Sequence, residues 1–242
     1  MRTRVSPRLR HGVAILEQNG ASSVTPALRQ APKQPGAACP LCPRLAEFRA
    51  RNRAIFPDWH NAPVASFGDI NGRLLIVGLA PGLRGANRTA RPFTGDWAGD
   101  LLYQTLDKFT FSHGVYGSHS DDGLRLLDCR ITNAVRCVPP KNKPIGVEIR
   151  TCAPFLQAEI DAMENLEVIL ALGGLAHGAI LSVLGANKSA FKFAHQAQHA
   201  VSDHPLLVNS YHCSRYNTNT RRLTEAMFED VFRDIRQLLD SP

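Results

Sequence analysis

The stretch LLIVGLAPGLRGANRTARPFTGD, residues 74–96, begins as a short apolar run and continues as a long loop rich in glycine. The run Leu74–Val77 predicts a buried strand, and a helical pattern from Trp97 to Phe109 follows the loop. Glycines let a backbone approach a ligand closely, and free amides near a helix start favour negative charge. The loop lacks the GK[ST] of a Walker motif and does not read GxGxxG, so it is weak support for a nucleotide cofactor.

Strand and helix patterns alternate four times along the chain. The further strands are predicted at Cys129–Val135, Val168–Leu172 and Leu206–Val208, and the further helices at about 147–164, 174–184 and 221–239. This alternation predicts an α/β fold, a three-layer α/β/α sandwich around a central four-stranded parallel sheet. Ligands of such sheets bind outside the carboxyl ends of the strands. Three polar loops follow strands there: residues 78–96, 132–137 and 210–222.

Length and charge bound the function. The 242 residues suit one domain or two small ones, and the net charge is +7. Most of the excess lies in residues 1–36, which we interpret as a basic tail with a composition typical of disorder, ahead of a domain at 37–242. A basic chain favours an acidic partner such as nucleic acid, although a solvated tail explains the same charge. The sequence shows neither a secretory signal nor a membrane span, so we expect a cytoplasmic monomer.

Six cysteines divide into two groups. Cys39 and Cys42 form a CxxC pair, and Cys137 and Cys152 lie far downstream with fourteen residues between them. Four thiolates suit either a [4Fe–4S] cluster or a tetrahedral zinc ion, and the ligand count does not separate these. Cys129 and Cys213 are interpreted as buried core residues, because cysteine packs as a small hydrophobe.

Three segments resemble the motifs of family 5 uracil-DNA glycosylases. GLAPGLRGANRTARPFTGD (78–96) is similar to the first motif, ITNAVRC (131–137) to the second, and SYHCSRYNTNT (210–220) to the third. The four-cysteine framework resembles the iron–sulfur site of families 4 and 5. The resemblance covers about residues 37–240. Two positions depart from the pattern: Ala90 replaces a usual glycine, and Cys213 replaces a common proline, which leaves a thiol near the predicted site.

The resemblance assigns a pocket for a flipped base. Gly78, Ala80 and Gly82 would line it, and Phe93 would stack on the uracil ring. Asn133 would read the base edge or hold water, since an amide both donates and accepts. His212 would donate a hydrogen bond to uracil O2 as charge develops there. Without the resemblance, we would interpret Phe93 as a core residue. Asn133 is also typical of a turn at the end of a strand, and Asp96 is equally typical of a helix cap.

The chemistry implied is hydrolysis without a strong base. Leu79, Ala80 and Pro81 offer no water-activating group in the first motif, so we expect a largely dissociative reaction in which water traps an oxocarbenium-like sugar. Asn133, Asn87 and Asp96 are the candidates for holding that water, and the sequence does not rank Asn87 against Asp96. No lysine nucleophile is evident, which predicts a monofunctional enzyme that removes uracil and other deaminated bases such as hypoxanthine from DNA.

The third motif also predicts contacts with DNA. Arg215 or Tyr216 would wedge into the gap left by the flipped base, and Lys143 and Arg222 are secondary candidates for phosphate contacts. The main candidates for phosphate contacts are Arg215, Asn217, Asn219, Thr220, Arg221 and Lys141. Two other functions remain open at this point. One is an iron–sulfur protein that binds damaged DNA without hydrolysis, and the other is a zinc-stabilised small-molecule binder of flavodoxin-like fold.

Overall fold

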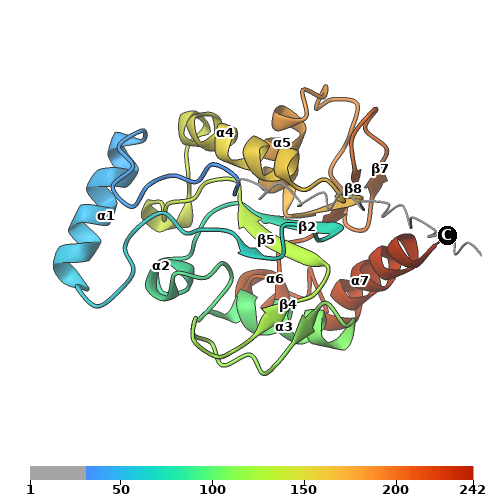
Figure 1. Cartoon of the computed structure of the whole chain (residues 1–242), viewed down its shortest axis with the longest axis horizontal. Coiled ribbons are helices and arrows are strands. Elements are labelled where there is room, and N and C mark those ends of the chain that lie inside the picture. The colour runs from blue at the N-terminus through green and yellow to red at the C-terminus, as the bar shows by residue number, and fades with distance from the viewer. Residues whose placement is uncertain (1–30, 242) are drawn as a thin grey trace, which may run out of the picture. The chain divides into compact units, whose positions relative to one another are not determined.

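The computed structural model describes residues 31–241 (Figure 1). Its helices are α1 (Pro43–Ile55), α2 (Ala86–Thr89), α3 (Trp97–Lys108), the 3-10 turn η1 (Pro140–Asn142), α4 (Gly146–Ala162), α5 (Gly174–Val183), α6 (Arg215–Asn219) and α7 (Glu225–Asp240). Its strands are β1 (Phe67–Gly68), β2 (Leu74–Gly78), β3 (Ser112–His113), β4 (Arg125–Leu126), β5 (Cys129–Asn133), β6 (Val168–Leu172), β7 (Gln198–His199) and β8 (Leu206–Ser210).

The middle layer is a mixed six-stranded sheet. Its strand order is β1-β5-β2-β6-β8-β7. The central four strands, β5, β2, β6 and β8, are parallel, while the two-residue strands β1 and β7 pair antiparallel at the edges. The predicted four-stranded parallel sheet is therefore confirmed as the centre of the sheet, and two short edge strands extend it. Strands β3 and β4 pair separately.

Helices cover both faces of this sheet. Leu74 and Ile76 of β2 pack with residues of α3 and α7, whereas Leu75 and Val77 pack with residues of α4 and α5. The two helix pairs lie on opposite sides of the sheet (Figure 1). A strand with both faces covered needs consecutive apolar residues, which explains the unbroken run at 74–77. The predicted three-layer sandwich is confirmed.

Capping residues fix where the helices start. Asp96 caps α3 by accepting a hydrogen bond from the Gly99 amide at 3.3 Å. The Thr224 hydroxyl accepts from the Met227 amide at 3.2 Å, so α7 begins at Glu225. The prediction that the last helix begins near residue 221 is wrong by about one turn. Residues 215–219 form the separate short helix α6 instead.

Helix α1 lies outside the sandwich and was not predicted, because its polar sequence carries no apolar stripe. Its buried Leu45 packs against Val135 and Phe155 beside the cysteines Cys137 and Cys152. Residues 1–30 of the predicted tail lie outside the described residues. The Gln34 side chain, within the same predicted tail, contacts Glu159 and Arg136, so contacts with the domain begin before residue 37. No helix within residues 31–241 is both long and apolar enough to cross a membrane.

Candidate active site

A cavity of about 390 Å³ opens at the carboxyl ends of β2, β5 and β8, the sheet edge at which ligands of parallel sheets bind. Segments distant in the sequence meet in it. Its lining residues are Leu79, Ala80, Pro81, Gly82, Ala86, Phe93, Asp96, Trp97, Ala98, Asn133, Asn142, His212, Ser214 and Arg215. The structure thus brings Ala80, Gly82, Phe93, Asn133 and His212 together with Asp96 and Arg215, as the sequence predicted for a site.

The floor of the cavity depends on Gly78. This residue ends β2 and pairs with Asn133 at the end of β5. A Cβ atom on Gly78 would lie 2.5 Å from the Asn133 Oδ1 and 2.6 Å from the Phe93 Cζ. Gly78 does not line the cavity itself. It leaves the space in which the amide and the ring stand side by side.

Phe93 is held by an unusual backbone and a buried clamp. Its φ is +51°, a conformation that costs an L-residue energy and needs support from its surroundings. Arg91 supplies support, donating two hydrogen bonds to the Asp122 carboxylate at 2.7 and 2.6 Å and one to the Thr94 hydroxyl at 2.9 Å. The Arg91 guanidinium is buried between the rings of Phe67, Tyr103 and Tyr116. The clamp fixes the turn that presents the Phe93 ring.

Asp96 both caps α3 and lines the cavity. One carboxylate oxygen accepts the Gly99 amide, and the other would lie 2.1 Å from a Cβ on Gly85 and 2.8 Å from one on Gly82. The two glycines therefore make room for the carboxylate. Burial raises the pKa of Asp96 above its usual value. A carboxylate with a raised pKa accepts a proton more readily than an exposed one.

His212 forms the opposite wall, with its ring centroid 5.9 Å from that of Phe93. Burial lowers its pKa to about 4, so the imidazole is neutral at neutral pH. The Asn217 side chain donates to the His212 carbonyl at 2.8 Å and holds the backbone of this loop. A neutral imidazole still donates one N–H, which suits it to a hydrogen bond with a developing anion.

Asn87 does not line the cavity, although the sequence named it as a candidate. Its side chain is fully buried and donates to the Asn61 Oδ1 at 2.9 Å. Its backbone amide donates to the Gly82 carbonyl at 3.1 Å. Asn87 is therefore placed to brace the 78–96 loop, and Asp96 is the better positioned of the two candidates.

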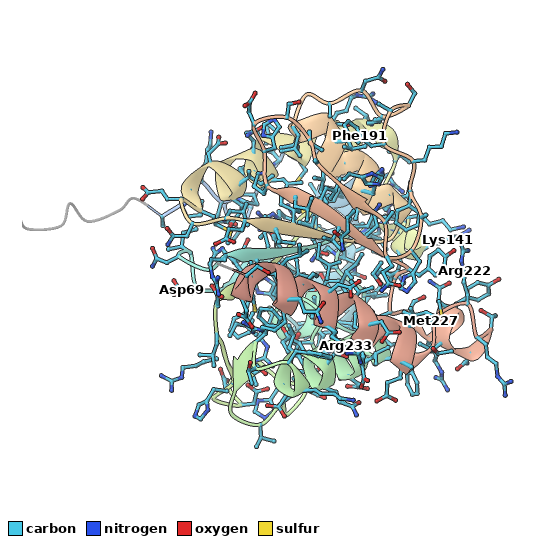
Figure 2. The ribbon with its side chains drawn as sticks, turned by 90° about the vertical axis from the view of Figure 1, so that its right-hand side faces the viewer. Asp69, Lys141, Phe191, Arg222, Met227 and Arg233 are labelled. Carbon is cyan, nitrogen blue, oxygen red and sulfur yellow. The ribbon has the colours of Figure 1, made fainter. Side chains whose placement is uncertain are left out.

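The rim of the cavity carries the predicted DNA contacts. The Arg215 guanidinium lies over the Trp97 ring at 5.6 Å, and Tyr216 is 73% exposed beside it. The Trp97 indole donates to the Thr218 hydroxyl at 2.9 Å and ties α6 to α3. Asn219, Thr220, Arg221 and Lys141 are exposed, and Figure 2 shows Lys141 and Arg222 projecting on the same side of the molecule.

Sequence reasoning missed several residues of the lining, of which three carry polar groups. Trp97, Asn142 and Ser214 all face the cavity. Asn142 accepts a hydrogen bond from the Leu83 amide at 3.4 Å, which joins the loop after β5 to the loop after β2. Trp97 was assigned only to a predicted helix. Its position at the start of a helix, directly after the first motif, was the signal that could have placed it at the site.

The four predicted ligand cysteines also meet in the structure. Cys39, Cys42, Cys137 and Cys152 line one small cavity between α1, the end of β5 and α4. Within residues 31–241, no three His, Cys, Asp or Glu side chains are positioned to bind a single metal ion directly. Four cysteine sulfurs around one cavity are a donor set suited to a [4Fe–4S] cluster or to a zinc ion, and their number does not separate the two.

The cysteines of this cavity are buried or half-buried, and two of their sulfurs accept hydrogen bonds from arginines. Burial raises the pKa values of Cys42 and Cys152, and raises that of Cys137 to about 11. As free thiols these groups are neutral, and a metal must displace their protons to bind. Arg49 donates to the Cys137 sulfur at 2.8 Å, and the Arg136 amide donates to the Cys152 sulfur at 3.4 Å.

The other two cysteines are core residues, as predicted. Cys129 and Cys213 are fully buried, and no disulfide joins any of the six cysteines. The Cys213 sulfur donates to the Ala98 carbonyl at 3.4 Å, so this thiol fills the core beneath the site and is not exposed at it. Its contact with the start of α3 anchors the His212 loop.

Comparison with known proteins gives one consistent result. The family model of the uracil DNA glycosylase superfamily matches residues 65–236. A type-5 uracil-DNA glycosylase of Thermus thermophilus is 44% identical over 216 residues, 87% of this chain and 98% of that protein. Type-5 enzymes of Pyrobaculum aerophilum and Mycobacterium leprae are 38% and 40% identical over 81% and 83% of this chain, and 86% and 91% of their own lengths.

Proposed function

Because the chain belongs to the uracil DNA glycosylase superfamily, we propose that it removes uracil from DNA by hydrolysing the N-glycosidic bond. One observation of the site supports this most directly: an aromatic ring, an amide and a neutral imidazole, Phe93, Asn133 and His212, face one cavity at the sheet edge. A base inside a duplex cannot reach such a cavity, so the nucleotide must flip out of the helix.

Each of the three side chains has a role in this proposal. Phe93 stacks on the flipped base, and Asn133 pairs with its polar edge. His212 donates its N–H to uracil O2, where negative charge grows as the bond between C1′ and N1 breaks and N1 keeps the electron pair. A preorganised donor of this kind stabilises the transition state and costs no reorganisation.

Water completes the reaction. The base leaves early, an oxocarbenium-like sugar forms, and a water oxygen adds to C1′ to give an abasic site. Asp96 is the residue we assign to this water, with Asn133 beside it, since its carboxylate lies in the cavity and its raised pKa suits it to take up the proton that water releases. The water attacks a cation, so a strong base is not required.

The cavity also supports a broader range of bases. A volume of about 390 Å³ exceeds what one pyrimidine fills, and Leu79, Ala80 and Pro81 present no polar side chain that would select uracil alone. Removal of hypoxanthine is therefore part of the proposal. We further propose that the exposed Tyr216 is the wedge, because Arg215 is held over Trp97 at the rim.

The four cysteines fit an iron–sulfur cluster, with zinc as the alternative. Cys39, Cys42, Cys137 and Cys152 would hold it, and it would join α1 and the loop after β5 to the body of the domain. When bound, such a cluster supplies structural stability and a one-electron redox centre. Phosphate contacts by Arg215, Arg221 and Lys141 stay part of this proposal, and the monomeric state and cytoplasmic location stay predictions.

Cleavage of a duplex oligonucleotide with one uracil, followed by hot alkali, tests the proposed function. Wild-type protein should give alkali-labile sites, and His212→Ala should lower the single-turnover rate by about 10²–10³-fold. His204→Ala, at an exposed histidine, serves as the matched control and should leave the rate unchanged. Tight binding of uracil DNA without any product would instead favour a damage-binding protein.

A further inference from the structure

Arg49 is a buried cation that has no carboxylate partner among residues 31–241. Its side chain, on α1, is only 4% exposed. None of the ion pairs formed within residues 31–241 involves it. Its hydrogen bonds go to the Cys137 sulfur at 2.8 Å and the Cys39 carbonyl at 2.7 Å, and its buried Nε has no partner among the described residues. The described part of the chain thus places no opposite charge beside this guanidinium to offset the cost of its desolvation.

The nearby carboxylates are already engaged elsewhere. Glu148 accepts two hydrogen bonds from Arg44, both at 2.7 Å. Glu159 serves two cations, Arg130 at 2.6 Å and Arg136 at 3.4 Å. Two arginines, Arg49 and Arg136, line the cysteine cavity, and no carboxylate among the described residues lines it.

A metal-bound set of four thiolates carries the opposite charge. Four thiolates around a doubly positive core leave two negative charges, for a [4Fe–4S] centre and for zinc alike. This charge would offset the excess on the arginines. Among the described residues, Arg49 is the arginine whose guanidinium donates a hydrogen bond to a ligand sulfur, whereas Arg136 donates to one through its backbone amide. Hydrogen bonds to the sulfurs and local charge are what set the potential of such centres.

We propose that Arg49 is the counter-charge of the four-cysteine site, which retains the bound group and raises its reduction potential. The inference rests on the cofactor part of the proposed function and is independent of uracil removal. A positive charge beside the cluster favours the reduced form, which carries one more negative charge. Loss of Arg49 should therefore weaken retention of the group and lower its potential.

The test compares substitutions of Arg49 with a control on the same helix. Arg49→Met removes the charge at similar length, and Arg49→Lys keeps it. Arg51→Met removes a charge that is 61% exposed on α1 and forms an ion pair with the exposed Glu47. Protein is purified without oxygen, and iron, acid-labile sulfide and zinc are measured per chain. Absorbance near 400 nm is followed during exposure to a chelator, and the potential is measured by dye-mediated titration with dithionite.

The expected result is specific to position 49. Arg49→Met should lose iron and sulfide several-fold faster than wild type and titrate at a more negative potential, while Arg51→Met should match wild type. Arg49→Lys should retain the group and stay close to wild type. Equal retention and equal potential in Arg49→Met would overturn the proposal. If Arg49→Met does not fold, Arg49→Lys carries the test. A folded Arg49→Lys that loses iron as fast as a variant lacking one of the four cysteines would overturn the proposal equally.

Metal analysis of wild type separates the two underlying questions. Zinc in place of iron and sulfide would keep Arg49 as the counter-charge but remove the effect on potential, so the proposal would fail in that part. Wild type with neither metal, yet active on uracil DNA, would sink both the cofactor and the role of Arg49 while leaving the glycosylase intact.

Discussion

Gly78→Ala tests whether the floor of the cavity holds the reacting base. The added Cβ would lie 2.5 Å from the Asn133 Oδ1 and 2.6 Å from the Phe93 Cζ, where ordinary contacts begin at 3.4 Å. The amide and the ring must therefore move by about 0.8 Å or more. A misplacement of about 1 Å costs on the order of 10²-fold in rate. We expect kcat/KM on uracil DNA to fall by about that factor.

Stability should change much less than activity. Overpacking of a core costs about 1–3 kcal/mol, which lowers Tm by roughly 2–12 °C in a domain of this size. At 25 °C the variant stays folded, so a single-turnover assay reads the geometry of the site and not the folded fraction. Gly178→Ala is the control, because a Cβ on Gly178 meets nothing within 4 Å. Activity of Gly78→Ala within about threefold of wild type would refute the assignment of Phe93 and Asn133 to the base pocket.

Three further predictions concern the loop after β2 and the loop that carries His212. Ala90 has a φ of +67°, so Ala90→Gly should raise the free energy of unfolding by about 0.5–1 kcal/mol in urea titration; a loss would contradict the strain. Hydrogen bonds from Arg91 hold the pKa of Asp122 well below its usual range. The ion pair therefore stabilises the fold at pH values above the usual pKa of an aspartate, and this stabilisation is lost as the pH falls through the lowered pKa. Asp122→Asn should then cost about 3 kcal/mol at pH 7 and much less near pH 2. Because the pKa of His212 is lowered to about 4, the pH profile of kcat/KM should show no inflection near the usual histidine value of 6.5, and an inflection there that His212→Gln removes would disprove the neutral donor.

The sequence was sufficient for the centre of the fold. Strands β2 and β6 are runs of apolar residues, at 74–77 and 168–172, as strands covered on both faces require. Strands β5, with the sequence CRITN, and β8, with LLVNS, mix apolar and polar residues, and the alternation of strand and helix patterns along the chain predicted them. The edge strands β1 and β7 have two residues each, too few to show any alternation. Helix α1 escaped prediction for a related reason, since Leu45 is its one buried apolar side chain. Its place is set by contacts with the cysteine region and not by amphipathic periodicity.

The sequence predicted those residues of the candidate site that lie in loops directly after the parallel strands. Phe93, Asn133 and His212 were expected together because β2, β5 and β8 end at one edge, and the structure brings them together. The position of Asn87 was not predictable, since a buried pairing with Asn61 across the fold leaves no trace in the motif. Asp96 was expected either to cap a helix or to serve the site, and its two oxygens do both.

The strand order also sets the distance between the two backbones that carry the rings of the cavity. Neighbouring strands lie about 4.8 Å apart, and β6 separates β2 from β8, so the ends of β2 and β8 stand about 10 Å apart. Phe93 and His212 reach across this interval from the loops that follow those strands, and their ring centroids are 5.9 Å apart. The sheet therefore sets the distance that the loops must span, and the side chains on the loops set the width that remains for a base.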